Sequence, residues 1–549
     1  MRKIILAVIV LVVLGSATAF LIYRYKNKPV PTALGWKANV TTIAGDGSPL
    51  VLSDPFGVAV AADGTIYVAD AGESNRIRKI SPDGNVSTLA GGGEGFADGS
   101  GAAASFNTPS ALALGPGGNL YVADTGNNRI RKITPDGKVS TVAGNGSAGY
   151  VDGPAAQAQF NGPIGLAVSV RGDIYVADTY NDVIRMITNE GEVTTIAGGG
   201  MPGYADGERK AALFDTPSGI IVVEDSSLIV ADTGNSRLRK VSVEGNVTTL
   251  TISGEELSQP IGLAFSHDHF LYVTELDHSR VVQVAPDGVA RVTATQLNQP
   301  TGIAIGPRIN KPTELFVADS GDYLVRKLDQ IAASTAVVDP LPKLTNETLG
   351  QQSLIWPVDP QQRPHEVVAT MGEVRGSFDT DDSRHHLHSG LDVFGAYGET
   401  VRAVRSEKVV SPQPNWGFDS LNEGFRVGVV SYIHLHVGRD KDAKMFDDPR
   451  FIPVNNSEGK LERVRVRRGA RFKPGDALGT INKMYHIHMN IGPPGGEINP
   501  LSLAPIGFKD DIPPTFEKDG IQLFDANGAR LKEMQDDRLV VRGPVRIVV

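Results

Sequence analysis

Short apolar runs alternate with polar turns between about residues 36 and 330, and the same order of motifs recurs along this stretch. Six openings similar to Pro-x-Gly-Leu-Ala begin 40 to 54 residues apart, at Pro55, Pro109, Pro163, Pro217, Pro260 and Pro300. Each opening precedes a run like Tyr-Val-Ala-Asp, a polar turn and a run like Arg-Ile-Arg-Lys-Ile. Several short β-rich runs per repeat indicate the blades of a β-propeller.

The ends of the repeated region are complementary. The sixth repeat ends near Leu328 without its last strand, and a matching run stands before the first repeat at Asn39–Gly45. We therefore predict that the N-terminal strand completes the last blade, which removes the exposed sheet edges. The motifs resemble the NHL repeat family over residues 36–330, and the resemblance implies a six-bladed β-propeller.

Extra residues in the first three repeats share an aspartate eight positions before a phenylalanine. The three aspartates are Asp98, Asp152 and Asp206, and the phenylalanines are Phe106, Phe160 and Phe214. We interpret them as a packing device between blades; the alternative is a ligand or cation site at the mouth of the ring. The aspartate that ends each Tyr-Val-Ala-Asp run is expected to cap its own turn.

Composition excludes several classes of protein. The 549 residues include 53 Lys+Arg, 62 Asp+Glu and no cysteine, with a formal net charge of −9. An acidic chain without a basic face is atypical of nucleic-acid binders. The absence of cysteine excludes disulfides, thiolate-ligated clusters and thiol nucleophiles, so any metal site needs His, Asp or Glu.

The N-terminus indicates an exported protein. Residues Ile4–Tyr23 carry no charge and lie between basic residues, which predicts a transmembrane helix within an anchor segment at residues 1–28. The alternative is a signal peptide cleaved after Ala17-Thr18-Ala19. Both interpretations place the rest of the chain in the cell envelope outside the cytoplasm, membrane-anchored or, after cleavage, secreted.

Histidines are concentrated in the second half, where eight of the 11 lie between His365 and His488. Side chains two apart on a strand point to the same side, so His486 and His488 should enter one cleft. His388 and Asp392 can join them if the chain bends near Gly390. Two imidazoles, a carboxylate and an open position are typical of a catalytic zinc site.

The order of these motifs resembles the M23 metallopeptidase family (LytM, lysostaphin-like) over about residues 370–505. The resemblance implies an antiparallel β-sheet domain, here at 353–508, which hydrolyses peptide bonds in peptidoglycan with Zn²⁺. By motif position, His388, Asp392 and His488 would bind zinc, and His434 and His486 would be catalytic. A competing assignment takes His434 and His436 as the ligand pair.

The sequence departs from the M23 pattern in three places. Asn482–Tyr485 stands in place of the usual turn before His486, Met489-Asn490-Ile491 follows His488, and Ser411–Phe425 resembles an insertion. We expect these differences to reshape the substrate cleft and to leave the metal ligands in place. His385 and His386 have no position in the pattern and are expected in an exposed loop.

Two further segments complete the organisation. Residues 331–352 are expected to form a linker, and residues 509–549 a short β-rich tail whose last strand either is truncated or pairs with the peptidase domain. The chain is thus predicted to be mainly β and multidomain: an envelope zinc endopeptidase with the propeller as a binding or scaffold module of unidentified partner. The alternatives are a catalytically inactive envelope scaffold or regulator of wall hydrolases, and a lyase or hydrolase based on the propeller.

Overall fold

The computed structural model describes residues 32–48, 50–307, 312–330, 354–362, 365–371, 374–375, 386–456, 458–492 and 497–503, and four short strands between 522 and 548. The predicted membrane segment, the linker at 331–352 and His385 lie outside the described residues. No helix in the described part is long and apolar enough to cross a bilayer. Strands dominate it, which confirms the prediction of a mainly β protein.

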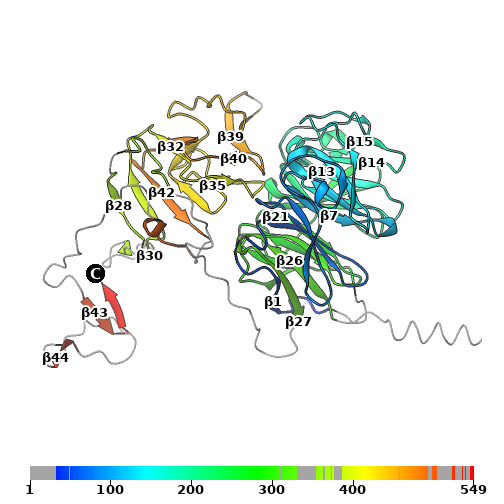
Figure 1. Ribbon diagram of the computed structural model, residues 1–549, viewed down its shortest axis with the longest axis horizontal. Coiled ribbons are helices and arrows are strands. Elements are labelled where there is room, and N and C mark those ends of the chain that lie inside the picture. Colours follow the sequence, from blue (N-terminus) through cyan, green and yellow to red (C-terminus); the bar gives the residue numbers. More distant parts are fainter. Residues whose placement is uncertain are drawn as a thin grey trace, which may run out of the picture.

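Six antiparallel sheets form the first half of the described chain (Figure 1). The first three contain β2 (Pro55–Val60), β3 (Ile66–Asp70), β4 (Arg76–Ile80) and β5 (Val86–Ala90); β7 (Pro109–Leu114), β8 (Leu120–Asp124), β9 (Arg129–Ile133), β10 (Lys138–Ala143) and β6 (Gly99–Ser100); and β12 (Gly165–Val168), β13 (Ile174–Asp178), β14 (Val183–Ile187), β15 (Glu192–Ala197) and β11 (Gly153–Pro154). The other three contain β17 (Pro217–Val222), β18 (Leu228–Asp232), β19 (Arg237–Val241), β20 (Asn246–Thr249) and β16 (Gly207–Glu208); β21 (Pro260–Phe265), β22 (Leu271–Glu275), β23 (Arg280–Val284) and β24 (Ala290–Ala294); and β25 (Pro300–Ile305), β26 (Glu314–Asp319), β27 (Leu324–Gln330) and β1 (Ala38–Ala44).

The sheets follow one another around a propeller-like ring. The first strand of each sheet contacts the first strand of the next, and β25 contacts β2. The N-terminal β1 pairs with β27, from Ala38 opposite Gln330 to Ala44 opposite Val325. The prediction that the N-terminal strand completes the last sheet is therefore confirmed.

The helical elements of the described residues are short 3-10 turns. These 3-10 turns are η1 (Gly101–Ala103), η2 (Pro116–Gly118), η3 (Thr125–Asn127), η4 (Thr179–Asn181), η5 (Arg209–Ala211), η6 (Thr233–Asn235), η7 (Ser320–Asp322) and η8 (Pro500–Leu503).

The three repeated aspartates hold buried arginines. Arg131 on β9 lies between Asp98 and Asp124, at 2.6 Å from each carboxylate. Asp124 also accepts a hydrogen bond from Asn127 Nδ2 in its own turn, at 2.9 Å, as predicted for a capping aspartate. Phe106 is fully buried between the first two sheets and lies under the Arg131 guanidinium. The same arrangement recurs with Arg185 and Arg239, so these residues pack the blades.

A second β unit contains residues 354–503, in yellow and orange in Figure 1. Its main sheet has the order β28 (Val367–Ala369), β31 (Leu391–Phe394), β42 (His486–Ile491), β36 (Val430–Ile433), β35 (Gly424–Val427) and β34 (Asn415–Trp416). A three-stranded sheet contains β32 (Thr400–Arg402), β41 (Ala477–Ile481) and β37 (Leu435–Val437). Paired strands complete the unit: β29 (Val374–Arg375) with β30 (His386–Leu387), β33 (Glu407–Lys408) with β40 (Arg471–Phe472), and β38 (Phe451–Asn455) with β39 (Leu461–Val466).

This unit has its own hydrophobic core, and the core determines which face of β42 is accessible. Ile487 and Met489 are buried in the core, whereas His486 and His488 alternate with them on the opposite face and stay half-buried. In the tail, β43 (Gln522–Asp525) pairs with β46 (Val545–Val548), and β44 (Met534–Gln535) pairs with β45 (Arg538–Leu539). The last strand therefore pairs within the tail, so the alternative pairing with the preceding domain was wrong.

Candidate metal centre

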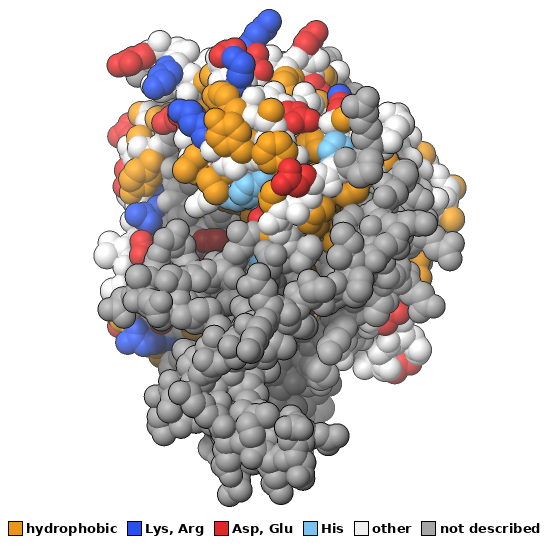
Figure 2. All heavy atoms as spheres, turned by 90° about the vertical axis from the view of Figure 1, so that its left-hand side faces the viewer, with side chains coloured by type: hydrophobic (Ala, Val, Ile, Leu, Met, Phe, Trp, Pro, Cys, Tyr) orange, Lys and Arg blue, Asp and Glu red, His pale blue; other side chains and the backbone are white. Residues whose placement is uncertain are grey.

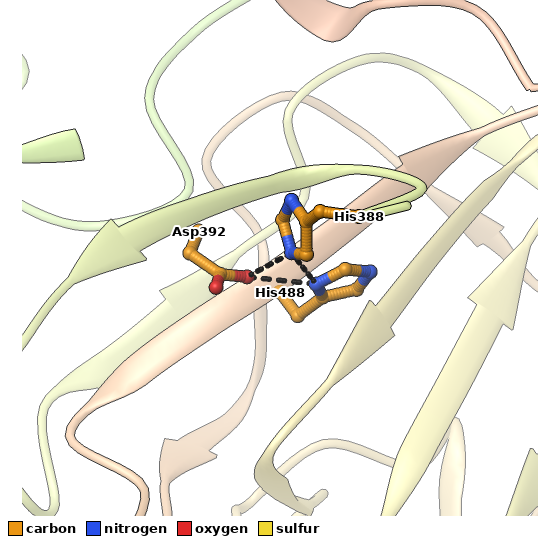
Figure 3. A group of neighbouring side chains, drawn as sticks. All are labelled: His388, Asp392 and His488. Carbon is orange, nitrogen blue, oxygen red and sulfur yellow. Dashed lines mark hydrogen bonds and ion pairs between the residues drawn. The ribbon is translucent and has the colours of Figure 1, made fainter. Parts of the chain in front are cut away.

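Two neighbouring strands bring three of the predicted residues together. Asp392 on β31 is directly opposite His488 on β42 in the antiparallel register. His388 lies just before β31, in the turn that follows β30. Figure 3 shows the three side chains pointing toward one point between the strands. The expectation that His486 and His488 share one side of their strand is met by the alternating burial of β42.

The three polar atoms lie within hydrogen-bonding distance of one another. Asp392 Oδ1 is 2.7 Å from His488 Nδ1 and 3.1 Å from His388 Nε2, and the two ring nitrogens are 2.9 Å apart. His388 and Asp392 are buried, and His488 is half-buried. Three potential ligand atoms thus converge in a largely dehydrated position, where a positive charge between them is strongly favoured.

The outer nitrogen of each imidazole has a fixed partner. His388 Nδ1 donates to the Thr370 carbonyl at 3.0 Å, and His488 Nε2 donates to Asn490 Oδ1 at 2.8 Å. In a neutral ring, the nitrogen opposite the donating one carries a lone pair. These partners therefore assign lone pairs to His388 Nε2 and His488 Nδ1, the atoms that face Asp392. Outer partners of this kind are typical of metal-binding histidines.

Gly390 is required by space at this site. A Cβ atom there would lie 2.1 Å from Asn490 Oδ1 and 2.8 Å from His488 Nε2. Any side chain would therefore displace the asparagine that orients His488. The sequence argument expected a glycine-dependent bend, but Gly390 is absent from the positive-φ glycines among the described residues, so close packing is the reason instead.

The two other predicted histidines lie beside the cluster. The rings of His434 and His486 have centroids 4.8 Å apart, and His486 Nε2 is 3.7 Å from Asp392 Oδ2. His434 Nδ1 donates to the Leu421 carbonyl at 2.7 Å, and His486 Nδ1 donates to the Met484 carbonyl at 2.8 Å. Each neutral ring therefore carries its lone pair on Nε2, where it can exchange a proton with a bound molecule.

Electrostatics favours an ionised Asp392 carboxylate and an uncharged His434 ring at the site. Burial raises the pKa of Asp392, but the neighbouring His488 and His388 lower that pKa by more. Burial lowers the pKa of His434, and the neighbouring His486 lowers it further. At neutral pH Asp392 is thus ionised and His434 uncharged, the protonation states that metal binding and general-base chemistry need.

The competing ligand pair is not brought together. His434 has a φ of 78°, which interrupts the strand between β36 and β37, so His434 and His436 do not share a face. His436 lies 3.7 Å from the Glu423 carboxylate, which also binds Arg439. His386, expected in an exposed loop, lies instead on β30, paired with Arg375.

Sequence reasoning missed four partners of the site. Asn490 is two residues from His488 on the same strand face, and this spacing of two could have identified it. Thr370, Leu421 and Met484 contribute backbone carbonyls. Their side chains carry no signal for that role, because any residue type provides a carbonyl oxygen.

Comparison with known proteins supports the prediction of NHL repeats in the first half of the chain. The family model described as NHL repeat matches residues 106–133 and 160–182. The chain carries NHL repeats. It is 29% identical over 232 residues to Protein SUPPRESSOR OF QUENCHING 1, chloroplastic, from Arabidopsis thaliana. The aligned region covers 39% of this chain and 22% of that protein. Human Teneurin-4 is 31% identical over 261 residues, 40% of this chain and 9% of that protein.

Human NHL repeat-containing protein 2 is 32% identical over 268 residues, which are 38% of this chain and 37% of that protein. The chain therefore spans well under half the length of these relatives. Among solved structures, a streptogramin B lyase aligns over 55% of this chain and 90% of its own, with a TM-score of 0.36 and 14% identity. A putative gluconolactonase aligns over 58% and 98%, with a TM-score of 0.40 and 12% identity. None of these names refers to a peptidase, so the peptidase activity stays a prediction.

Proposed function

We propose that residues 354–503 form an M23-like zinc peptidase domain and that the protein hydrolyses peptide bonds. The observation that carries the proposal is the convergence of His388 Nε2, His488 Nδ1 and Asp392 Oδ1 at 2.7–3.1 Å. An ion-binding role accounts for all three orientations at once. A purely structural cluster would have no need for outer acceptors that turn both imidazole lone pairs inward.

The donor set suits zinc. Two imidazole nitrogens and one carboxylate oxygen leave a fourth tetrahedral position for water or substrate, as in catalytic zinc sites. Oxygen-rich sites that prefer Mg²⁺ or Ca²⁺ have six or more ligands, few of them imidazole. When bound, zinc would polarise the scissile carbonyl and lower the pKa of a water molecule.

His434 and His486 would perform the proton transfers. Their Nδ1 atoms are occupied by the Leu421 and Met484 carbonyls, so Nε2 is the atom of each ring that can take up or release a proton. The lowered pKa of His434 keeps this ring neutral and able to accept a proton at neutral pH. After proton uptake, either ring could donate to the leaving amine or stabilise the oxyanion.

The surroundings of the site support a peptide as substrate. Exposed apolar side chains lie next to the histidines: Leu421 and Met484 bear the two accepting carbonyls, Tyr485 precedes His486, and Phe394 pairs with it across the strands. Figure 2 shows histidine side chains among hydrophobic ones on this face. Such a border fits a chain with side groups better than a small anion.

The substrate class and location follow from the sequence as proposals. Peptidoglycan stem or cross-link peptides are the substrates that the M23 resemblance implies, and the uncharged N-terminal segment would place the enzyme in the cell envelope. The NHL ring would act as the six-bladed binding or scaffold module. We do not propose a lyase or hydrolase based on the propeller, because the candidate centre lies outside the ring.

Digestion of purified peptidoglycan sacculi with mass analysis of the released fragments tests the proposal. We expect about one zinc per chain, release of peptide fragments, loss of release after chelation and its return with added zinc. Zinc binding without any hydrolysis of sacculi or of a peptide library would favour the non-catalytic scaffold. Hydrolysis that persists in metal-free protein would overturn the zinc mechanism.

A further inference from the structure

The second β unit, residues 354–503 and hereafter the C-terminal unit, places a basic edge against one face of the ring; this edge consists of Arg465 and Arg468. Arg468 is fully buried, pairs with Asp54 at 2.6 Å and stacks 3.7 Å above the Phe56 ring. Arg465 bridges two further aspartates, Asp182 at 2.7 Å and Asp215 at 2.8 Å. Arg468 and Arg465 therefore connect three sheets of the ring to the unit that carries the candidate metal centre.

These ring aspartates differ from those that hold the blades together. Asp124 pairs with Arg131 of its own sheet, whereas the arginines that pair with Asp182 and Asp215 come from the other unit. Burying a carboxylate is costly unless a cation accompanies it. This face of the ring is thus built for a basic partner, and in this chain the partner is the edge near β39.

The segment Ser411–Glu423 begins at this interface. Arg468 Nη1 donates to the Val410 carbonyl, and the Arg468 amide donates to Tyr180 Oη of the ring at 2.7 Å. Tyr180 Oη in turn lies 3.5 Å from the Pro412 carbonyl. Further along, Asn415 Nδ2 donates to the Val464 carbonyl on β39 at 2.8 Å. The start of the segment is therefore held jointly by ring and basic edge.

The other end of the segment holds His434. The Leu421 carbonyl accepts from His434 Nδ1 at 2.7 Å, and the Glu423 carbonyl accepts from the His434 amide at 2.9 Å. The Glu423 carboxylate is fixed by two nitrogens of Arg439, at 2.5 and 2.8 Å. His434 has a positive φ of 78°, which is unfavourable for a residue with a Cβ and persists only where neighbours enforce it.

We propose that Ser411–Glu423 is a positioning segment through which docking of the basic edge on the ring orients the imidazole of His434. The inference rests on the proposed function, in which His434 transfers protons. Docking holds the start of the segment, the Leu421 carbonyl then fixes the tautomer and direction of the ring, and Nε2 faces the candidate centre. The ring is accordingly a part of the catalytic unit as well as a binding module.

The test uses full-length protein with the interface weakened at two places. Arg465→Ala with Arg468→Ala removes the basic edge, and Tyr180→Phe removes a single hydroxyl on the ring side. We expect kcat to fall by about 10²-fold in the double variant, with KM and zinc content nearly unchanged, because misplaced catalytic groups cost rate more than binding. Tyr180→Phe should lower kcat in the same direction by less. Arg402→Ala, which removes a pair with Asp359 inside the second unit, is the matched control and should leave kcat unchanged.

Hydrogen exchange supplies a readout that does not depend on activity. Amide protection over residues 417–423 and the His434 Nδ1 proton signal should both weaken in the double variant and stay as in the parent protein in Arg402→Ala. Unchanged protection and unchanged kcat in a folded, undocked double variant would overturn the proposal. If the parent protein proves inactive, the proposed function fails, whereas the exchange data still decide whether docking orders the segment.

Discussion

Buried charged side chains occur in both units, but their partners differ. In the ring, Arg131 meets two carboxylates at 2.6 Å, so the protein's own side chains provide both the cation and the anions. In the C-terminal unit, Asp392 meets the lone-pair nitrogens of His388 and His488, whose outer nitrogens already donate elsewhere. The first arrangement is complete as a structural ion pair, and the second gathers acceptors around one point.

This comparison separates packing from chemistry. A buried ion pair whose members satisfy each other can be repeated in sheet after sheet, as Arg131, Arg185 and Arg239 are. Among the described residues, no second group of three His, Asp or Glu ligand atoms converges in this way. Buried charge therefore indicates a metal site here only where the acceptors outnumber the donors that face them.

The largest effect is expected from removing a candidate ligand. Asp392→Ala and His388→Ala should each lose bound zinc and all detectable hydrolysis, because two remaining ligands hold zinc poorly. Atomic absorption on purified full-length protein measures the zinc. His365→Ala, a histidine of the same unit outside the cluster, is the control and should keep one zinc per chain. Full zinc content in Asp392→Ala would remove this residue from the site.

Removing a buried arginine of the ring should lower the free energy of unfolding and leave zinc binding unchanged. Arg239→Ala leaves Asp232 buried without its cation, which should cost about 3–5 kcal/mol of unfolding free energy. Its neighbour Lys240 forms an exposed pair with Asp225, so Lys240→Ala should cost less than about 1 kcal/mol. Urea unfolding measures both values. Equal losses in the two variants would contradict the distinction between buried and exposed pairs.

The repeats explain how much of the fold could be predicted. Six copies of one motif indicate six sheets, and the displaced strand at Asn39–Gly45 indicates how the ring closes. Spacing along β42 likewise placed His486 and His488 on one face. Those arguments need only local periodicity.

Long-range contacts could not be predicted in the same way. Thr370 orients His388 through a carbonyl, and Leu421 orients His434 through another, so residue identity carries no information about either contact. The docking of Arg465 on Asp182 joins residues far apart in the chain. A charged side chain in a sequence does not reveal which distant partner it meets.

A smaller effect is expected from the residue that orients His488. Asn490→Ala removes the acceptor of the Nε2 proton and should lower zinc affinity by about 10- to 100-fold without abolishing binding. Asn490→Asp keeps an acceptor oxygen and should retain most of the affinity. Competition with a chromophoric chelator measures the constants, with Asn456→Ala in an exposed turn as control. Unaltered affinity in Asn490→Ala would show that the outer hydrogen bond is irrelevant to zinc.

The smallest effect tests the repeated aspartates of the ring. The Asp206 side chain is about half exposed, 48%, so its pair with Arg239 is screened by solvent while Asp232 remains on the buried side. Asp206→Asn should therefore lower the unfolding free energy by about 1 kcal/mol or less, measured by urea unfolding with and without Ca²⁺. The same small loss in both conditions is expected of a packing residue. A calcium-dependent stabilisation that disappears in Asp206→Asn would instead support a cation site in the ring, and the contrast between the two units would no longer hold, because each would then gather acceptors around an ion.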